Sequence, residues 1–275
     1  GVALDWVAEL FGEYAWPQIT VTDRVEGGAT EYPMLYMTSG GAVVHETMHM
    51  VAHGILANNE WAEGWLDEGM ASFLSDWLRV ERGADPEQVW GRSRDFVARA
   101  DRLGRTEPVG LAGAEFSSYA MYSAMTYDKG ALVLRMLREL VGEATFREAL
   151  RAYYQRYRFR QVTRHDFRRV LEEVAGRDLD WFFHQWLDTT DWLDYRVADV
   201  SVSGDGTDLT VTAEIAREGE AWMPVIVQAG DARVTVDSRE RHTTVTLRPT
   251  TRPDAVVVDP DGVLLDADRS NNRRP

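Results

Sequence analysis

The stretch AVVHETMHMVAHG, residues 42–54, places three of the chain's six histidines within nine residues. His45 and His49 are four residues apart, and Glu46 directly follows the first of them. On a helix, residues i and i+4 lie about 40° apart around the axis and about 6 Å apart along it. Both imidazoles can therefore reach one metal ion, and Glu46 can reach a water molecule beside that ion. This H-E-x-x-H spacing predicts a metal site in which the glutamate serves as a general base.

Two histidines do not complete a catalytic zinc site, which takes three protein ligands and keeps one position open. The segment WLDEGMASF (65–73) offers Glu68 after 18 intervening residues. A helix, a turn through Asn58-Asn59 and a returning helix would bring Glu68 back to the histidines. The chain has no cysteine, and two imidazoles with a carboxylate suit zinc better than magnesium or calcium. We therefore predict one zinc ion held by His45, His49 and Glu68.

His53 lies one further turn along the same helix and is the competing candidate. In the metzincin pattern a glycine follows the second histidine by three residues and a third histidine follows it by six. This chain has Ala52 and Ile55 at those positions. We expect His53 to be a polar group at the rim of the pocket or a buried histidine with satisfied hydrogen bonds, and not a ligand.

Composition narrows the possible partners. The net charge of −15 argues against binding to the phosphate backbone of nucleic acids. The Arg- and Tyr-rich segment 146–169 does not change this, because its helical period places arginines on a solvated face and aromatic residues inward. No apolar run approaches the roughly 20 residues that a membrane-spanning helix needs. We expect no nucleic-acid partner and no membrane-spanning segment.

The metal residues fall in a region with helical patterns. Helical spacing over about 3–14 is followed by alternation typical of strands at 18–22 and 34–39. Since helical spacing begins at Leu4 without a cap or a signal sequence, we expect the chain to be a fragment of a longer protein. Between about 41 and 190 the clearest predicted helices cover residues 42–57, 61–82, 86–103, 118–141, 143–157, 163–174 and 179–188.

The pattern changes near residue 190. Residues 209–215 alternate between apolar and polar, and SGDGTD (203–208) is typical of a hairpin turn. Further strands are predicted at 243–247 and 255–258. The expected organisation is a first domain over residues 1–190, a small all-β domain over 191–268 and a frayed tail over 269–275.

Four further motifs accompany the candidate zinc ligands, and together they resemble the gluzincin aminopeptidases, the family of membrane alanyl aminopeptidase and leukotriene hydrolase. HETMH followed by the glutamate of WLDEGMA matches the family's zinc motif. GATEY (28–32) is similar to its G-x-M-E-N exopeptidase motif, and YDKGALVLRML (127–137) is similar to its tyrosine motif. TRHDF (163–167) and FFHQWL (182–187) resemble its downstream helices. The resemblance covers about residues 17–190.

The resemblance implies an α+β fold: a mostly helical, thermolysin-like zinc peptidase domain, followed here by a small all-β, sandwich-like domain. It implies a zinc aminopeptidase that removes N-terminal residues from peptides with a free N-terminus. Tyr127 would donate a hydrogen bond to the developing oxyanion, and Glu31 would pair with the substrate's α-amine. Gly28 and Ala29 would line the peptide as an edge strand.

Two alternatives remain open at this point. If Glu31 does not bind an amine, the chain is a zinc endopeptidase; it could also be a non-catalytic, zinc-bearing, peptide-binding module. Departures from the family pattern at Thr30, Tyr32, Val51 and Met70 predict an altered pocket shape with the chemistry retained. The family's N-terminal β domain, expected in the full-length protein, is not in this chain. Bacterial relatives with Tyr-Pro after the motif glutamate are often exported, which suggests an extracytoplasmic location by analogy.

Overall fold

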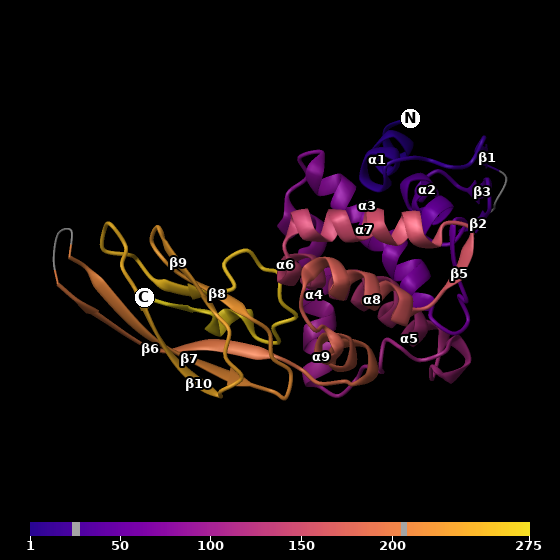
Figure 1. Ribbon diagram of the computed structural model, residues 1–275. Helices are drawn as coiled ribbons and strands as arrows, with labels where there is room; N and C mark the ends of the chain where they lie inside the picture. Colours follow the sequence, from indigo (N-terminus) through magenta and orange to yellow (C-terminus); the bar gives the residue numbers. More distant parts are fainter. Residues whose placement is uncertain (24–27, 205–207) are drawn as a thin grey trace. The chain divides into compact units, whose positions relative to one another are not determined.

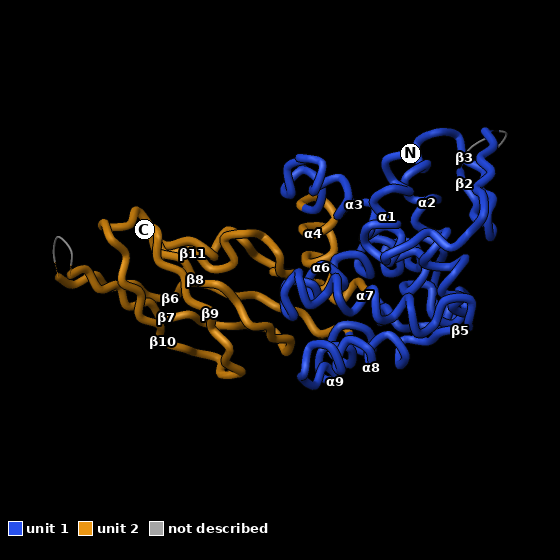
Figure 2. The backbone as a smooth tube through the Cα atoms, turned by 45° about the horizontal axis from the view of Figure 1, so that its top comes forward, with its two compact units in different colours: residues 1–90, 107–189 blue, residues 91–106, 190–275 orange. Residues whose placement is uncertain are grey.

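The computed structural model describes residues 1–23, 28–204 and 208–275, and the chain divides into two compact units. Unit 1 comprises residues 1–90 and 107–189, and unit 2 comprises residues 91–106 and 190–275 (Figure 2). The helical part of unit 1 ends with η4 (His184–Asp188), and the strands of unit 2 begin with β6 (Asp194–Ser203). Residues 91–106, which we had placed in the first domain, group with unit 2.

Unit 1 is mostly helical and includes small sheets near its N-terminal end (Figure 1). Its strands are β1 (Thr20–Thr22), β2 (Ala29–Tyr32), β3 (Leu35–Thr38), β4 (Leu56–Asn58) and β5 (Arg160–Val162). Its α-helices are α1 (Val2–Phe11), α2 (Val43–Ala52), α3 (Met70–Glu81), α5 (Tyr119–Ser123), α6 (Gly130–Val141), α7 (Glu143–Tyr157), α8 (Arg164–Ala175) and α9 (Asp180–Phe183). A short 3₁₀ turn, η2, covers Gly113–Glu115, and helix α4 (Pro86–Arg102) crosses the boundary between the units.

One three-stranded sheet lies beside the helix that carries the histidine motif. Its strand order is β1–β3–β2, with β1 parallel and β2 antiparallel to β3, so that β2 is an edge strand. Helix α2 packs against β2, β3, α1 and α3. Every residue from Glu46 to Ala52 is therefore buried, although the segment contains polar residues.

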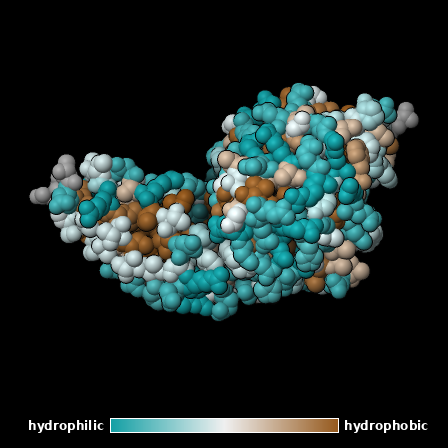
Figure 3. All heavy atoms as spheres, in the orientation of Figure 1, coloured by the Kyte–Doolittle hydropathy of each residue, from teal (hydrophilic) through white to brown (hydrophobic). Residues whose placement is uncertain are grey.

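The core of unit 1 is rich in aromatic side chains. Phe73, Trp77 and Phe146 pack ring against ring, with Phe73 at 5.4 Å from Trp77 and 5.7 Å from Phe146 between centroids. Each is at most 1% exposed. Because these rings come from α3 and α7, they hold α3, and the turn that precedes it, against the rest of the helical unit. The face of unit 1 seen in Figure 3 is mostly hydrophilic.

Within the described ranges, three helices contain π-helical turns, in which the backbone hydrogen bonds join residues i and i+5. These are η1 (Trp65–Gly69) before α3, η3 (Ala124–Lys129) between α5 and α6, and η4 (His184–Asp188) after α9. The expected helices 61–82, 118–141 and 179–188 therefore exist, but each contains a π segment. Glu68 and Tyr127 both lie in such turns.

The sequence-based prediction was wrong for two short strands. The helix expected over 42–57 ends at Ala52, where the backbone N–H of Gly54 donates to the carbonyl of His49 at 2.8 Å. Residues 56–58 then form β4, which pairs in parallel with β5. This pairing joins segments far apart in the sequence, so the local pattern gave no sign of it.

Unit 2 contains two β-sheets. The first has the order β10–β7–β6 and the second has the order β12–β11–β8–β9. Their strands are β6 (Asp194–Ser203), β7 (Thr210–Glu218), β8 (Val225–Ala229), β9 (Ala232–Val236), β10 (His242–Leu247), β11 (Val256–Val258) and β12 (Arg273–Arg274). Contacts of β11 and β12 with β6 join the sheets, in agreement with the expected sandwich-like domain. The hairpin turn predicted at 203–208 falls largely outside the described residues.

The end of the chain is ordered, contrary to the expected frayed tail. A 3₁₀ turn, η5 (Arg269–Asn271), leads into β12, which pairs antiparallel with β11. Asn272 is 3% exposed, and its side-chain amide donates to Asp266 at 3.1 Å. Buried hydrogen bonds therefore fix a segment whose polar sequence had suggested a tail. In the described part of the chain, no helix combines the length and apolar character of a membrane span.

Candidate metal centre

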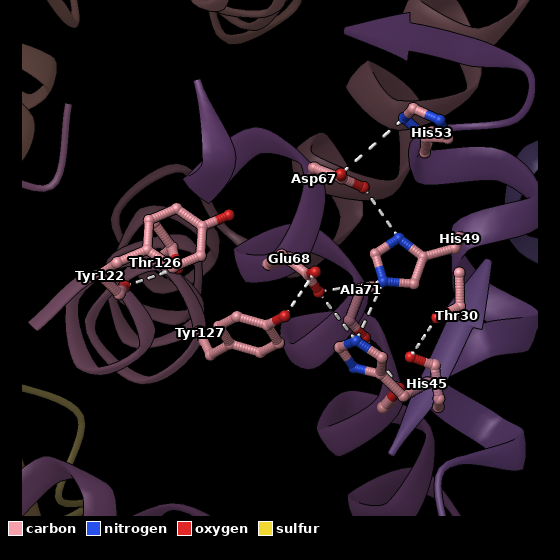
Figure 4. Close-up of polar contacts among 12 residues, drawn as sticks. Thr30, His45, His49, His53, Asp67, Glu68, Ala71, Tyr122, Thr126 and Tyr127 are labelled. Carbon is pink, nitrogen blue, oxygen red and sulfur yellow. Dashed lines mark hydrogen bonds and ion pairs between the residues drawn. The ribbon is translucent and has the colours of Figure 1, made fainter. Parts of the chain in front are cut away.

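Helix α2 presents both histidines of the motif toward one point (Figure 4). The Nε2 atoms of His45 and His49 are 3.0 Å apart. The side chain of His49 is 1% exposed and that of His45 is 20% exposed. The predicted i, i+4 geometry is thus present, with one ring fully inside and the other at the edge of the site.

Glu68, from the π turn η1, faces the same point. Its Oε2 atom is 3.1 Å from Nε2 of His45 and 3.1 Å from Nε2 of His49. Tetrahedral zinc with ligand bonds of about 2.0–2.2 Å separates its ligand atoms by roughly 3.3 Å. The three donor atoms are spaced close to what one such ion requires, and their chemical types are those of a catalytic zinc site.

The electrostatics of the site also favour a cation. Burial alone would lower the pKa of His49, but the carboxylates of Asp67 and Glu68 outweigh it and raise this pKa well above its ordinary value. Burial alone would raise the pKa of Glu68, but hydrogen bonds with the two histidines outweigh it and lower this pKa well below its usual range. The carboxylates of Asp67 and Glu68 therefore stabilise positive charge at His49. A bound metal ion would provide that positive charge without protonation of the histidine.

Asp67 is a functional candidate that the sequence reasoning missed. Its Oδ1 atom lies 2.8 Å from Nδ1 of His49, and both side chains are 1% exposed. A carboxylate on the far nitrogen of a metal-binding histidine fixes the ring's orientation and raises its basicity. The sequence does show an aspartate next to Glu68. However, the direction of the Asp67 side chain depends on the π turn η1, which the sequence pattern did not predict.

Tyr127 reaches Glu68 from the other π turn, η3. Its hydroxyl donates a hydrogen bond to Oε1 of Glu68 at 2.5 Å. Burial and the nearby Glu68 carboxylate raise the pKa of Tyr127 far above its ordinary value, so that the hydroxyl keeps its proton. The residue predicted to stabilise an oxyanion is therefore a neutral donor at the edge of the metal cluster.

Two glycines allow η1 and η3 to approach closely. The Cα atom of Gly69 would lie 3.3 Å from a Cβ built on Gly130, and a Cβ on Gly69 would lie 2.7 Å from the carbonyl oxygen of Thr126. Real Cβ atoms essentially never make the second contact. Glycine directly after Glu68 is therefore part of what brings Tyr127 to that carboxylate.

Glu46 lies on α2 beside the metal cluster and is 3% exposed. Its Oε2 atom has no hydrogen-bond partner among the described residues. Burial raises the pKa of Glu46 to about 7, although His49 and His45 act in the opposite direction. A carboxylate with a pKa near neutrality, beside a metal site, has the properties of a general base.

Glu31 comes from the edge strand β2. Its carboxylate can approach a ring nitrogen of His49 and the carboxylate of Asp67, since one ligand atom from each lies within 4.8 Å of the others. Burial raises its pKa. Gly28 immediately precedes β2, and Ala29 is its first residue. The structure thus brings Glu31 close to His49 and Asp67 from the edge strand β2.

His53 does not join His45, His49 and Glu68. Its Nδ1 atom lies 3.8 Å from Oδ2 of Asp67, and its side chain is 25% exposed. This partial exposure of His53 agrees with the expectation of a polar group at the rim of the pocket. Its Nδ1 atom has no hydrogen bond among the described residues, so the alternative of a buried histidine with satisfied hydrogen bonds is wrong.

A mixed helix-and-sheet domain with a buried H-E-x-x-H helix and a distant third carboxylate is the architecture of a metallopeptidase catalytic domain. Comparison of the sequence with protein families gives the specific assignment. Residues 36–186 match the Peptidase family M1 domain. The chain belongs to peptidase family M1.

Individual relatives agree with this assignment. The chain is similar to aminopeptidase N of Streptomyces lividans, with 26% identity over 215 residues, covering 67% of this chain and 25% of that protein. It is also similar to aminopeptidase M1-B of rice (Oryza sativa subsp. japonica), with 30% identity over 148 residues, 52% of this chain and 17% of that protein. The chain spans a quarter or less of these relatives.

Solved structures show the same fold. Aminopeptidase A of Legionella pneumophila, in complex with aspartic acid, has a TM-score of 0.68 at 18% identity, covering 94% of this chain and 32% of that one. A mutant M1 zinc metallopeptidase from Deinococcus radiodurans, bound to a Tyr-Ser-Ala substrate, has a TM-score of 0.57 at 23% identity. It covers 67% of this chain and 42% of that one. These similarities confirm the expected fold class: an M1-type helical catalytic domain with a β domain.

Proposed function

We propose that this chain carries the active site of a zinc-dependent aminopeptidase. The observation that carries the proposal is the convergence of His45, His49 and Glu68, with donor atoms 3.0–3.1 Å apart. Membership of family M1 and the similarity to proteins named as aminopeptidases support the same activity. We infer one zinc ion at these three residues and peptides with a free N-terminus as substrates.

Zinc bound there would polarise the scissile carbonyl and make a water molecule more acidic. Glu46 is placed to accept the proton of the attacking water and then deliver it to the leaving amine. Its burial and its unpartnered Oε2 atom suit this role, because no protein donor competes for the oxygen. Asp67 keeps the ring of His49 in place during the reaction.

Tyr127 is placed to stabilise the oxyanion. Its hydroxyl, which donates to Glu68 in this structure, lies beside the metal ligands and can turn its hydrogen bond toward an incoming substrate oxygen. Such a donor acts in proportion to the charge that develops in the transition state. The side chain is therefore assigned to oxyanion stabilisation and not to metal binding.

Glu31 supplies the exopeptidase character. A carboxylate near the metal cluster can form a charge-assisted hydrogen bond with a protonated α-amine. An amine held there would limit the substrate to one residue before the scissile bond. Gly28 and Ala29 lie along the free edge of β2 and can offer main-chain hydrogen bonds to the extended substrate.

The test uses the zinc-loaded chain and three matched substrates: leucine p-nitroanilide, its N-acetylated form and a longer peptide blocked at its N-terminus. We expect cleavage of the free anilide and no cleavage of the acetylated one, because acetylation removes the charge that Glu31 binds. Cleavage of the blocked peptide would contradict the aminopeptidase assignment and support an endopeptidase. Cleavage of none of the three would support a binding module.

A further inference from the structure

An open hollow of about 420 Å³ adjoins the metal cluster within unit 1. Glu68 and Tyr127 are among its lining residues. Its walls are aromatic, being formed by Trp61, Phe116, Tyr119 and Tyr122. None of the candidate roles assigned so far uses these four side chains.

The aromatic wall is continuous and leads to Tyr127. The ring of Tyr122 stacks at 28° on that of Tyr119, with centroids 6.1 Å apart, and meets the ring of Tyr127 edge to face at 6.5 Å. Phe116 contacts Tyr122 edge to face at 5.6 Å. Tyr119 is 79% exposed and Trp61 is 70% exposed. These two rings are therefore free to cover a ligand.

The ionisable side chains that line the hollow, apart from its tyrosines, are all carboxylates. Its lining residues include the carboxylates of Glu60, Asp67 and Glu68, and no Lys, Arg or His belongs to the described lining. Asp67 and Glu68 face the two histidines. Glu60 forms no ion pair with any residue that the structure describes, although one of its carboxylate oxygens lies within 4.8 Å of ligand atoms of Asp67 and His53.

The hollow also begins where the substrate's amine would be held. Ligand atoms of Glu31 and Asp67 lie within 4.8 Å of each other, and Asp67 is a lining residue. A residue whose α-amine meets Glu31, and whose carbonyl lies between the metal position and the Tyr127 hydroxyl, would have its side chain beside the hollow that Asp67, Glu68 and Tyr127 line. The hollow is therefore the candidate site for the side chain of the N-terminal residue.

We propose that this hollow selects substrates whose N-terminal residue is basic, arginine above lysine, through Glu60 and the faces of Trp61 and Tyr119. The proposal rests on the proposed function and specifies its substrate class. A guanidinium is planar, stacks on aromatic rings and pairs with a carboxylate through two hydrogen bonds. A neutral apolar side chain would fill the same space but would leave Glu60 facing it without a partner.

Equilibrium binding tests the preference without relying on turnover. Argininamide, lysinamide, leucinamide and glutaminamide are titrated calorimetrically into the zinc-loaded Glu46→Gln chain, which cannot hydrolyse them. We expect argininamide to bind about tenfold more tightly than leucinamide or glutaminamide, with lysinamide between them. Equal affinities, or tighter binding of leucinamide, would overturn the preference and leave the aminopeptidase proposal standing. Binding of none of the four would overturn both.

Two variants in the same background locate the selectivity. Glu60→Gln should lower the ratio of argininamide to leucinamide affinity by about five- to tenfold. Glu148→Gln, which removes one exposed carboxylate on α7, should leave that ratio as it is, because a distant charge is screened. An equal fall in both variants would show that net charge, and not the hollow, attracts the cation, and would overturn the proposal.

Tyr119→Leu tests the aromatic contribution. The ring is 79% exposed, so its loss should not disturb folding. We expect the argininamide affinity to fall severalfold and the ratio of argininamide to glutaminamide affinity to fall with it. An unchanged ratio would contradict stacking of the guanidinium on this ring.

Discussion

At the scale of single residues, Glu46 and the metal ligands have separable roles. The Oε2 atom of Glu46 is buried and has no hydrogen-bond partner among the described residues, and no hydrogen bond there links Glu46 to the three ligands. Glu46→Gln keeps the size of the side chain but removes its ability to accept a proton. We expect kcat to fall by about 10²–10⁴-fold with the zinc content unchanged. Metal analysis and anilide hydrolysis on one preparation measure both, and loss of zinc together with activity would refute the assignment.

Tyr127→Phe tests the oxyanion donor. The substitution removes only the hydroxyl that now bonds Glu68. Loss of one such donor typically raises the barrier by about 2.7–4 kcal/mol. We expect kcat to fall accordingly, with zinc affinity close to that of the unchanged chain, since Tyr127 is not a ligand. Turnover equal to that of the unchanged chain would remove Tyr127 from the mechanism.

Asp67 acts on the metal through His49 and can be tested by zinc affinity alone. Asp67→Ala removes the acceptor 2.8 Å from Nδ1 of His49. Loss of such a partner typically costs about 10–100-fold in metal affinity. Asp67→Asn retains an acceptor oxygen, so we expect a smaller loss. Competition with a zinc-binding chromophore measures both variants, and an alanine variant that binds zinc as tightly as the unchanged chain would show that Asp67 has no orienting role.

At the scale of elements, the contact between η1 and η3 decides whether Glu68 and Tyr127 meet. Gly69→Ala would place a Cβ 2.7 Å from the Thr126 carbonyl oxygen, so the two turns must separate. Overpacking of this kind typically costs about 1–3 kcal/mol. We expect a lower free energy of unfolding and a displaced Tyr127.

Urea unfolding measures the cost of the glycine substitution. Gly41→Ala is the matched control, because a Cβ there meets nothing within 4 Å and its backbone is not left-handed. If Gly69→Ala were no more destabilising than Gly41→Ala, the close contact would not be a requirement of the fold.

The elements also show what sequence could and could not predict. The pair His45 and His49 could be predicted because one helical repeat determines their relative positions. The approach of Glu68 to this pair could be predicted from a returning helix, and its Oε2 atom lies 3.1 Å from both Nε2 atoms. The direction of Asp67 could not, because the π turn sets it. The β4–β5 pairing was missed since it joins segments from distant parts of the chain.

At the scale of the whole molecule, unit 2 carries buried carboxyl groups that make its stability depend on pH. Burial raises the pKa values of Asp194, Asp259 and Asp266, that of Asp266 to about 7. Between about pH 4 and pH 7 the unfolded chain releases the Asp266 proton while the folded unit retains it. The folded state binds more protons in this range, so the free energy of unfolding must fall as the pH rises through it.

Asp266→Asn removes this titration. We therefore expect the fall in stability of unit 2 between pH 4 and pH 7 to be smaller in the variant than in the unchanged chain. Asparagine keeps one oxygen for the backbone N–H of Tyr195, which donates to Asp266 at 3.0 Å. Urea unfolding followed by circular dichroism at several pH values measures the difference. An equal or steeper fall in the variant would contradict a raised pKa at this position.

The sequence predicts the start of the strands in unit 2 but not the pairing of its last residues. The change from helices, which end at Asp188, to strands, which begin at Asp194, could be predicted because the hydrophobic period changes there. The terminal pairing of β12 with β11 could not, since two arginines carry no strand signal. Their place in the sheet depends on Asn272 and Asp266, which meet only in the folded unit.

The central claim is that His45, His49 and Glu68 together hold one zinc ion. An anomalous difference map from zinc-grown crystals, with data on both sides of the zinc absorption edge, tests it most directly. We predict one strong peak within bonding distance of the Nε2 atoms of His45 and His49 and of the Glu68 carboxylate. A map with no peak among these three residues, or with its strongest peak at other side chains, would contradict the account.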